Sequence, residues 1–452
     1  MNVRSSLFVA CALGATLAAA GCRHEPVRRA HTEAVPIAPV APVALRTPAP
    51  APGGPGDPVA AARRLPPPTA NDGEHFADEV RQLYREVACG GTDTIADPAR
   101  AKVVDAHCKK IDATMKKYQD RYASVAKPFF DTVIPASAPK VVVYPFGGGD
   151  LISALAAFPD ADEVTTISLE LSGDPRRIST LTPKALGASL GELRTALGGT
   201  LTVGSNTSVN LSSSQQLDLP AQVSSFLLGL SFNGYEPVDM RYFRLEDDGS
   251  IHYYDRAEIA AMDAAIAERA AAKRGKRATA SSRKGDWVDP NFSEAFANVE
   301  IAYRKVGDPS GRIRIHRHIG WNLSNDELAR SPQLLRHLEQ KGKVTFLVKG
   351  GSYLLWEPAF STFRQYMLDH LAWMLSDSTG IPPRYAAAAG LVQDTYGNFS
   401  GPFLDGTGSR HTRDADDFRA LWRKNPHHKL AFRFGYVDSA GSAHLVVTRP
   451  GP

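Results

Sequence analysis

The sequence predicts a mixed α/β fold: a Rossmann-like, three-layer sheet preceded by an N-terminal helical hairpin. Strand-like and helix-like segments alternate from residue 141 onward, which is typical of parallel sheets with crossover helices. The stretch "EDDGS" separates two strand-like segments, and its Asp-Gly pair is a hairpin turn signal that adds antiparallel strands. Two cysteines lie in helix-like sequence ahead of residue 136, and these helices form the expected hairpin.

The first segment, residues 1–21, reads as a signal peptide. "MNVRSSLFVACALGATLAAAGC" places a positive charge before an apolar run too short to span a bilayer, and small residues follow. Ala19-Ala20-Gly21-Cys22 resembles the lipobox of bacterial lipoproteins, with Ala19 in place of the usual leucine. Lipidation of Cys22 is therefore expected, and several acyl chains would anchor the protein stably. An ordinary signal peptide with a chance cysteine is the alternative.

Residues 22–70 form the expected tether. They are rich in Pro, Ala and Val, a composition that favours extended structure without a core. A lipid anchor followed by such a spacer predicts a body held away from the membrane. Arg23 after Cys22 lacks the aspartate that retains some lipoproteins at the inner membrane, so the cell envelope, and the outer membrane within it, is the expected location.

The expected hairpin occupies residues 71–135. "HFADEVRQLYREVAC" carries apolar residues at helical spacing, and the next helix begins with Asp97 as N-cap and Pro98 in its first turn. Cys89 and Cys108 are an even pair in a chain expected to be exported, which predicts a disulfide. Two buried free thiols are the alternative.

The α/β domain is expected over residues 136–452. Its expected strands are Val141–Phe146, Glu163–Leu171, Met240–Leu245, Ile251–Tyr254, Val299–Val306, Arg312–Ile319, Val344–Val348, Lys429–Tyr436 and Ala443–Thr448. Its expected helices are Leu151–Phe158, Pro183–Leu197, Val223–Leu230, Arg256–Ala272, Asn325–Gln340 and Leu354–Trp373. Residues 273–286 are polar and basic without apolar periodicity, which predicts a flexible loop. A solvated loop is the simpler interpretation, and attraction to anionic envelope polymers is the other.

The turn "PFGGGD" follows the first strand of this domain and has the parts of an anion site. Gly147, Gly148 and Gly149 permit close approach of a ligand, and a helix N-terminus follows. Glu170 ends the next strand, where Rossmann-like folds place an acid that bonds a ribose hydroxyl. However, the spacing is not G-x-G-x-x-G, and Asp150 would repel a phosphate. A structural turn with Asp150 as N-cap is favoured, and a site for another ligand stays open.

A second candidate is "RIRIHRHIGW", in which Arg312, Arg314, His316 and His318 share one face of a strand. His-x-His on a strand can bind zinc when carboxylates converge on it. No HExxH motif or Cys/His cluster accompanies it, so a basic, solvated face is the preferred interpretation, with an anionic ligand as a further option. No metal or other cofactor is expected.

Longer motifs resemble one family. "VVVYPFGGGDLISALAAFPDA", "WNLSND", "VTFLVKGGSYLLWEPAFSTFRQYMLDHLAWMLSDSTGIPPRY" and "FRFGYVDSAGSAHLVVTRP" are similar to exported bacterial proteins with a Tyr-Pro-Phe-x-Gly-x-Asp signature. The resemblance covers roughly residues 140–450 and carries no known activity. It implies that the following residues belong to a shared plan: Tyr144, Asp150, Glu170, Asn325, Ser352, Tyr353, Asp377, Gly380 and Arg384.

These observations limit the function without fixing it. The formal net charge of +4 gives no indication of nucleic-acid binding, and no G-x-S-x-G nucleophile elbow is present. We therefore expect an envelope protein that binds a small molecule or an envelope polymer near Gly147–Asp150 and Glu170. The alternatives are an exported hydrolase that uses Asp150 and Glu170, with or without a metal, and a structural envelope lipoprotein without a pocket. The ligand-binding candidates are Tyr144, Gly147, Gly148, Gly149, Asp150, Glu170, Asp377 and Arg384.

Overall fold

The structure is a computed structural model that describes residues 72–202, 219–274, 293–403, 411–425 and 428–451. The expected signal peptide, Cys22, the tether and most of the basic 273–286 segment lie outside these residues. In the described part no helix has the length and apolar character needed to cross a bilayer.

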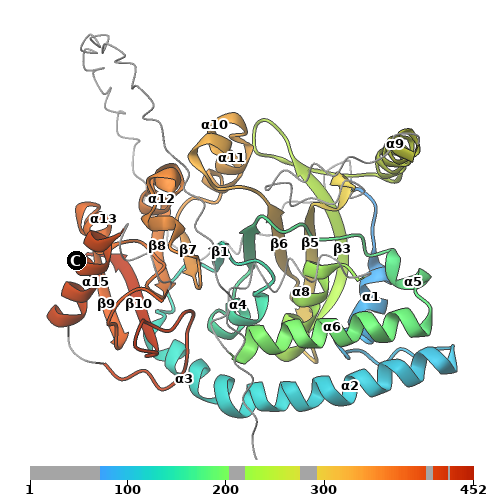
Figure 1. The fold of residues 1–452 in the computed structure, drawn as a ribbon, viewed down its shortest axis with the longest axis horizontal. Helices are drawn as coiled ribbons and strands as arrows, with labels where there is room; N and C mark the ends of the chain where they lie inside the picture. Colours follow the sequence, from blue (N-terminus) through green and yellow to red (C-terminus); the bar gives the residue numbers. More distant parts are fainter. Residues whose placement is uncertain (1–71, 203–218, 275–292, 404–410, 426–427, 452) are drawn as a thin grey trace, which may run out of the picture. The chain divides into compact units, whose positions relative to one another are not determined.

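One ten-stranded mixed sheet organises the described chain, as the mixed α/β prediction requires (Figure 1). The strand order is β4-β3-β5-β6-β2-β1-β7-β8-β10-β9. The strands are β1 Val141–Pro145, β2 Glu163–Ser168, β3 Tyr235–Leu245, β4 Ile251–Tyr253, β5 Asn298–Lys305, β6 Arg314–Gly320, β7 Val344–Val348, β8 Leu371–Ser376, β9 Leu391–Gly397 and β10 His444–Pro450. The central five, from β6 to β8, are parallel, and antiparallel strands extend the sheet on both sides.

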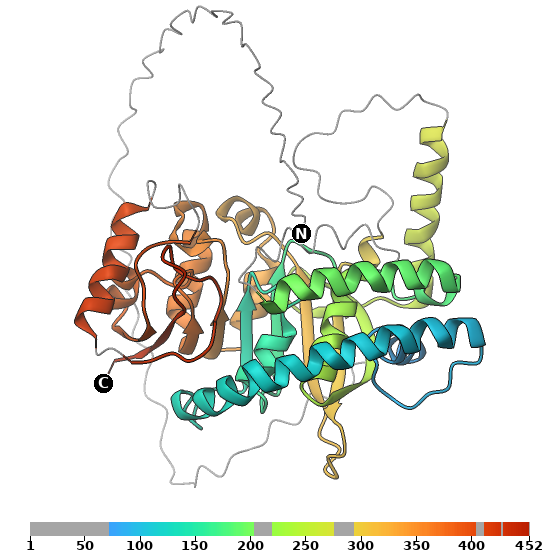
Figure 2. The same ribbon diagram turned by 60° about the horizontal axis from the view of Figure 1, so that its bottom comes forward.

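Helices before residue 235 contribute to one hydrophobic core. They are α1 Ala77–Glu86, α2 Pro98–Tyr118, the π-helix η1 Gln119–Ala123, α3 Ser124–Val133, α4 Leu151–Ala157, α5 Arg177–Thr180, α6 Pro183–Thr202 and α8 Ala221–Phe232. Figure 2 shows α2 and α6 lying side by side in front of the central strands, and the two helices are in contact. Val142 and Tyr144 of β1 belong to this core, whereas Val143 belongs to a second core, because alternate strand residues face opposite sides.

The second core contains side chains from α10 Asn325–Arg330, α11 Gln333–Glu339 and α12 Ser361–His370. The remaining helices are α9 Arg256–Arg274, α13 Pro383–Ala388, α15 Thr412–Lys424 and the 3-10 turns η2 Glu294–Phe296, η3 Leu354–Trp356 and η4 Pro358–Phe360. A third cluster joins α15 to the residues after β7 through Trp356 and Phe418, whose rings stack at 5.3 Å.

Local capping and the disulfide agree with the sequence. Asp97 caps α2 by accepting from the backbone N of Ala99 at 2.8 Å, and Pro98 is its first residue. Cys89 and Cys108 are joined by a disulfide, which links the residues after α1 to α2.

Three expected elements were wrong. The helix expected over Asn325–Gln340 is two helices, because Pro332 has no backbone N–H to continue the first. The helix expected over Leu354–Trp373 is instead two 3-10 turns, α12 and strand β8, since an apolar run alone does not distinguish a buried strand from a helix. Residues 429–436 form no strand in the described chain.

Candidate functional site

The strand order contains a topological switch point. From β1 the chain continues to β2 on one side, and it later returns to place β7 on the other side of β1. The loops that leave β1 and β7 therefore diverge at the carboxyl ends of these strands, which is where open α/β sheets hold ligands. Both loops are glycine turns: Phe146–Asp150 after β1 and Lys349–Tyr353 after β7.

The turn after β1 is packed against protein atoms. A Cβ at Gly147 would lie 2.7 Å from the ring of Tyr144, and one at Gly149 would lie 2.8 Å from Gln222 Oε1 of α8. Asp150 Oδ1 accepts a hydrogen bond from the backbone N of Ser153 at 3.3 Å and so caps α4. These glycines are therefore required for close packing of the chain with itself, in agreement with the structural-turn interpretation.

Asp150 is the centre of a buried polar cluster. The residue is 4% exposed, and its Oδ2 accepts from the Tyr144 hydroxyl at 3.0 Å and from Lys349 Nζ at 2.8 Å. Lys349 Nζ also donates to Ser153 Oγ at 2.8 Å. We call Tyr144, Asp150, Ser153 and Lys349 the Asp150 centre. Its ion pair spans the switch point, because Asp150 follows β1 and Lys349 follows β7.

Two further tyrosines lie near this centre. Tyr118 is the last residue of α2, Tyr122 lies within the π-helical turn η1, and their rings stack at 5.5 Å. Burial, and after it the charge of Asp150, raises the pKa of Tyr118 and of Tyr144 above the usual value of tyrosine. These phenols therefore stay protonated at neutral pH, and Tyr144 acts as a hydrogen-bond donor to the carboxylate.

Asp377 fixes the second turn. The side chain follows β8, is fully buried and accepts from the backbone N atoms of Gly350, Thr379 and Tyr436 at 2.8, 2.8 and 2.9 Å. Backbone donors satisfy a buried carboxylate without a cation. Since Gly350 follows Lys349 directly, Asp377 holds the backbone that directs Lys349 toward Asp150.

Unusual backbone conformations surround this turn. Phe146, Ser352 and Tyr353 have positive φ values of 61°, 51° and 59°, which cost about 1–2 kcal/mol each for residues with a Cβ. Ser352 is partly exposed, and its Oγ lies 3.4 Å from the Tyr436 hydroxyl. Such strain persists only where surrounding contacts impose it, and it is commonly found at functional sites.

The structure brings together only part of the predicted set. Tyr144, Gly147–Asp150 and Asp377 lie at neighbouring strand ends. Glu170 follows β2 and is 8% exposed, with its backbone carbonyl accepting from His318 Nε2 at 2.8 Å. Arg384 lies on α13, where its Nη1 pairs with Asp414 at 2.6 Å and with Asp417 at 3.2 Å. Arg384 therefore joins α13 to α15 and does not contact the Asp150 centre.

The preferred interpretation of the histidine row as a solvated face was wrong. His316 and His318 are fully buried, because α8 covers their face and Phe226 packs on both rings at 4.4 and 5.1 Å. His316 Nδ1 donates to the carbonyl of Val164 at 3.0 Å. Burial lowers the pKa of His316 to about 3 and that of His318 to about 4, so both are neutral. No group of three metal-ligating side chains occurs among the described residues.

Sequence reasoning missed Lys349 and Ser153 of the Asp150 centre. It also missed three tyrosines near the two turns: Tyr118, Tyr122 and Tyr436. The available signal was the position of Lys349 directly after the apolar strand β7, since Asp150 likewise lies in the turn that follows β1. Parallel strands bring such positions to one edge of the sheet. Reading "VTFLVK" as a strand beside "VVVYP" would have placed Lys349 near Asp150.

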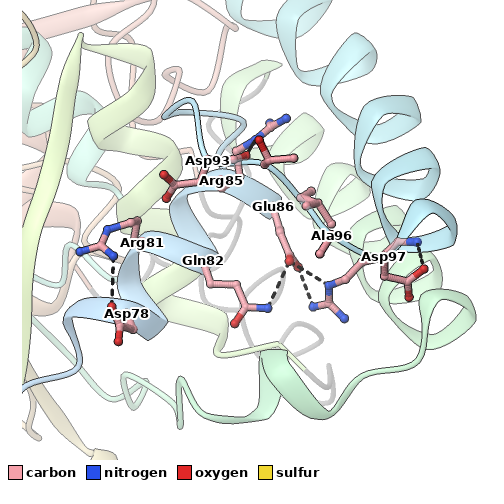
Figure 3. A pocket seen from close by; sticks show the side chains of 11 residues that line it. Asp78, Arg81, Gln82, Arg85, Glu86, Asp93, Ala96 and Asp97 are labelled. Carbon is pink, nitrogen blue, oxygen red and sulfur yellow. Dashed lines mark hydrogen bonds and ion pairs between the residues drawn. The ribbon is translucent and has the colours of Figure 1, made fainter.

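A separate pocket of about 400 Å³ lies between α1 and the start of α2 (Figure 3). Its charged side chains contact one another: Arg100 donates to both carboxylate oxygens of Glu86 at 2.8 and 2.6 Å, and Gln82 donates to Glu86 at 3.1 Å. Arg85 Nε donates to the carbonyl of Asp93 at 3.0 Å. These pairs leave the pocket with charges of both signs and no clear preference for a ligand.

Comparisons with protein-family models, with curated proteins and with solved structures give no match.

Proposed function

We propose that the protein is a lipid-anchored component of the cell envelope whose α/β body binds a small molecule or an envelope polymer at the switch point. The lipobox-like Ala19–Cys22 and the Pro/Ala-rich tether support the anchor. The order of the five parallel strands, with cores on both faces of the sheet, supports a Rossmann-like, three-layer arrangement. The disulfide between α1 and α2 supports a stapled helical hairpin before it.

The observation that carries the binding function is the position of Lys349. Its ammonium group lies at the carboxyl ends of β1 and β7, 18% exposed, beside a carboxylate and a hydroxyl. The partly exposed Gly149, Gly350 and Ser352 surround it, and two of the backbones with positive φ follow it. A ligand that reaches this edge therefore meets a cation, a serine hydroxyl and backbone groups held in fixed positions.

Hydrolysis is the second candidate, because Ser153 Oγ lies 2.8 Å from Lys349 Nζ. A lysine activates a serine only as a neutral amine that accepts the proton. As an ammonium ion paired with Asp150, Lys349 donates to Ser153 and has no lone pair to accept one. The arrangement in the structure thus favours binding over nucleophilic catalysis.

Thermal unfolding of the purified chain against nucleotides, divalent metals, sugars and cell-wall fragments tests the proposal. A ligand of this site should raise the unfolding midpoint of wild type and of Lys343→Met, and should not raise that of Lys349→Met. Lys343 is the matched control, since it precedes β7 at the other edge of the sheet and donates to a backbone carbonyl of Asp369.

The alternatives give different results. Turnover of ester or amide substrates that is lost in Ser153→Ala would establish the hydrolase. No ligand shift with any compound, together with a lower midpoint for Lys349→Met alone, would show that the Asp150 centre is purely structural.

A further inference from the structure

A second polar group lies where β5 and β6 pair, at the amino end of β6. Tyr303 of β5 and Arg314 of β6 are directly opposite each other in the antiparallel ladder, so their side chains lie on the same face of the sheet. Arg314 is 5% exposed and Tyr303 is fully buried. The position is at the opposite end of the parallel strands from the Asp150 centre, because Arg314 is the first residue of β6.

These two side chains have donors without acceptors. Arg314 Nε and Nη1 and the Tyr303 hydroxyl are buried and have no hydrogen-bond partner. The guanidinium lies over the ring of Tyr235 at 5.5 Å, but the Tyr235 hydroxyl is already used, since it donates to the carbonyl of Pro159 at 2.6 Å. A cation removed from water without an acceptor is strongly unfavourable.

Other arginines of the described chain that are buried or partly buried have acceptors. Arg364, which is 6% exposed, donates to the carbonyls of Leu355 and Glu357 at 2.7 and 3.3 Å. Arg317 on the same strand pairs with Glu163 and with Glu300, at 2.5 and 2.7 Å. Arg100 pairs with Glu86 at 2.6 Å. Arg314 differs from these, because its buried Nε and Nη1 have neither a carboxylate nor a carbonyl acceptor among the described residues.

Charges of both signs surround Arg314 and Tyr303. Lys305 lies two residues after Tyr303 on the same face. Burial, and after it the charge of Lys305, lowers the pKa of Lys127 of α3, so this second lysine also lies near. Of the neighbouring acids, Asp162 is paired with Arg312, and Asp308 accepts from the backbone N of Ser310 at 2.9 Å. Asp131 lies near Lys127, and Asp160 lies near Tyr235.

We propose that Arg314 and Tyr303 bind a small oxyanion, such as phosphate or a carboxylate group. The guanidinium and the hydroxyl donate to its oxygens, and the two lysines add positive potential. Charge-assisted bonds of this kind are about twice as strong as neutral ones. The site is independent of the proposed function, since it uses different residues at the other edge of the sheet. The oxyanion is either a free ion or a terminal group of an envelope polymer.

The test is titration of the purified full chain with inorganic phosphate, sulfate and acetate, followed by isothermal calorimetry and by the unfolding midpoint. Sodium chloride keeps the ionic strength constant. An arm with glycerol phosphate, which imitates a polymer-linked phosphate, distinguishes a free ion from a terminal group. Phosphate should raise the midpoint of wild type, and Tyr303→Phe should weaken binding by roughly tenfold, the loss expected for one donor.

Arg314→Met should abolish the phosphate-dependent shift. The matched control is Arg304→Met: Arg304 neighbours Tyr303 on β5, points to the opposite face and pairs with Glu236 at 2.7 Å, so this variant should bind phosphate as wild type does. If Arg314→Met fails to fold, the phosphate affinity of Tyr303→Phe relative to wild type decides whether the oxyanion binds at this position. The proposal is overturned if none of the oxyanions exceeds chloride with wild type, or if Arg314→Met or Tyr303→Phe binds as wild type does.

Discussion

Replacing Lys349 by methionine should lower the free energy of unfolding by about 2–3 kcal/mol, because it leaves Asp150 buried without its cation. The substitution keeps the aliphatic stem and removes two hydrogen bonds, to Asp150 Oδ2 and to Ser153 Oγ, both at 2.8 Å. Loss of one partner from a fully buried ion pair costs about 3–5 kcal/mol. We place the loss below this range, since the Lys349 side chain is 18% exposed and Asp150 keeps its bond from Tyr144.

The coupling energy of the Lys349–Asp150 ion pair is measured by urea denaturation of four proteins: wild type, Lys349→Met, Asp150→Asn and the double variant. Asparagine is as good an N-cap as aspartate, so Asp150→Asn removes the charge and keeps the bond to the α4 backbone. The coupling energy between the two changes should be about 1–3 kcal/mol. Lys343→Met, as the exposed control, should change stability by less than about 0.5 kcal/mol. A coupling energy below that control value would refute the view that this ion pair holds the switch point together.

Three further outcomes are expected. Replacing Cys89 and Cys108 by serine should lower the free energy of unfolding by about 3 kcal/mol, because the bond closes a loop of 19 residues; equal urea midpoints would contradict this. Burial lowers the pKa of His318 from 6.5 to about 4; the unfolded chain therefore binds the proton first, and stability should fall by up to about 3 kcal/mol as pH drops from 6.5 toward 4. His318→Gln, measured over the same pH series, should lose that part of the slope. Gly435→Ala should cost about 3 kcal/mol or more, because its Cβ would lie 2.0 Å from a buried carboxylate oxygen. Gly441→Ala, with open space at its Cβ and a φ of 82°, should cost only about 1 kcal/mol in the same denaturation assay.

The features predicted correctly from the sequence depend on residues close together in the chain. Asp97 and Asp150 were recognised as N-caps because the donor of each bond lies two or three residues further on. The disulfide between Cys89 and Cys108 was predicted from their number and the expected compartment. The strand and helix around Gly147–Asp150 followed from an apolar run and the turn after it.

The features that were missed depend on distant residues. Lys349 and Asp150 are separated by 199 positions, and only the strand order brings them together. Strand β8 was read as helix because "LAWMLS" is apolar on both faces, as a central parallel strand must be. Local periodicity cannot show which apolar run is covered on two sides, since that depends on helices contributed by other parts of the chain.

The row on β6 shows how the same limit affects a functional interpretation. Alternation along "RIRIHRH" correctly placed Arg314, His316 and His318 on one face, but the sequence did not show that α8 covers that face. Because this face is buried, its side chains are not the solvated, basic row that the sequence indicated. The histidines are neutral and packed against Phe226, whereas Arg314 at the end of the row has two buried nitrogens without a hydrogen-bond partner. An anionic ligand, which the sequence left as an open option for the whole row, therefore remains reasonable only at Arg314, because only there does the fold leave a buried cation unpaired.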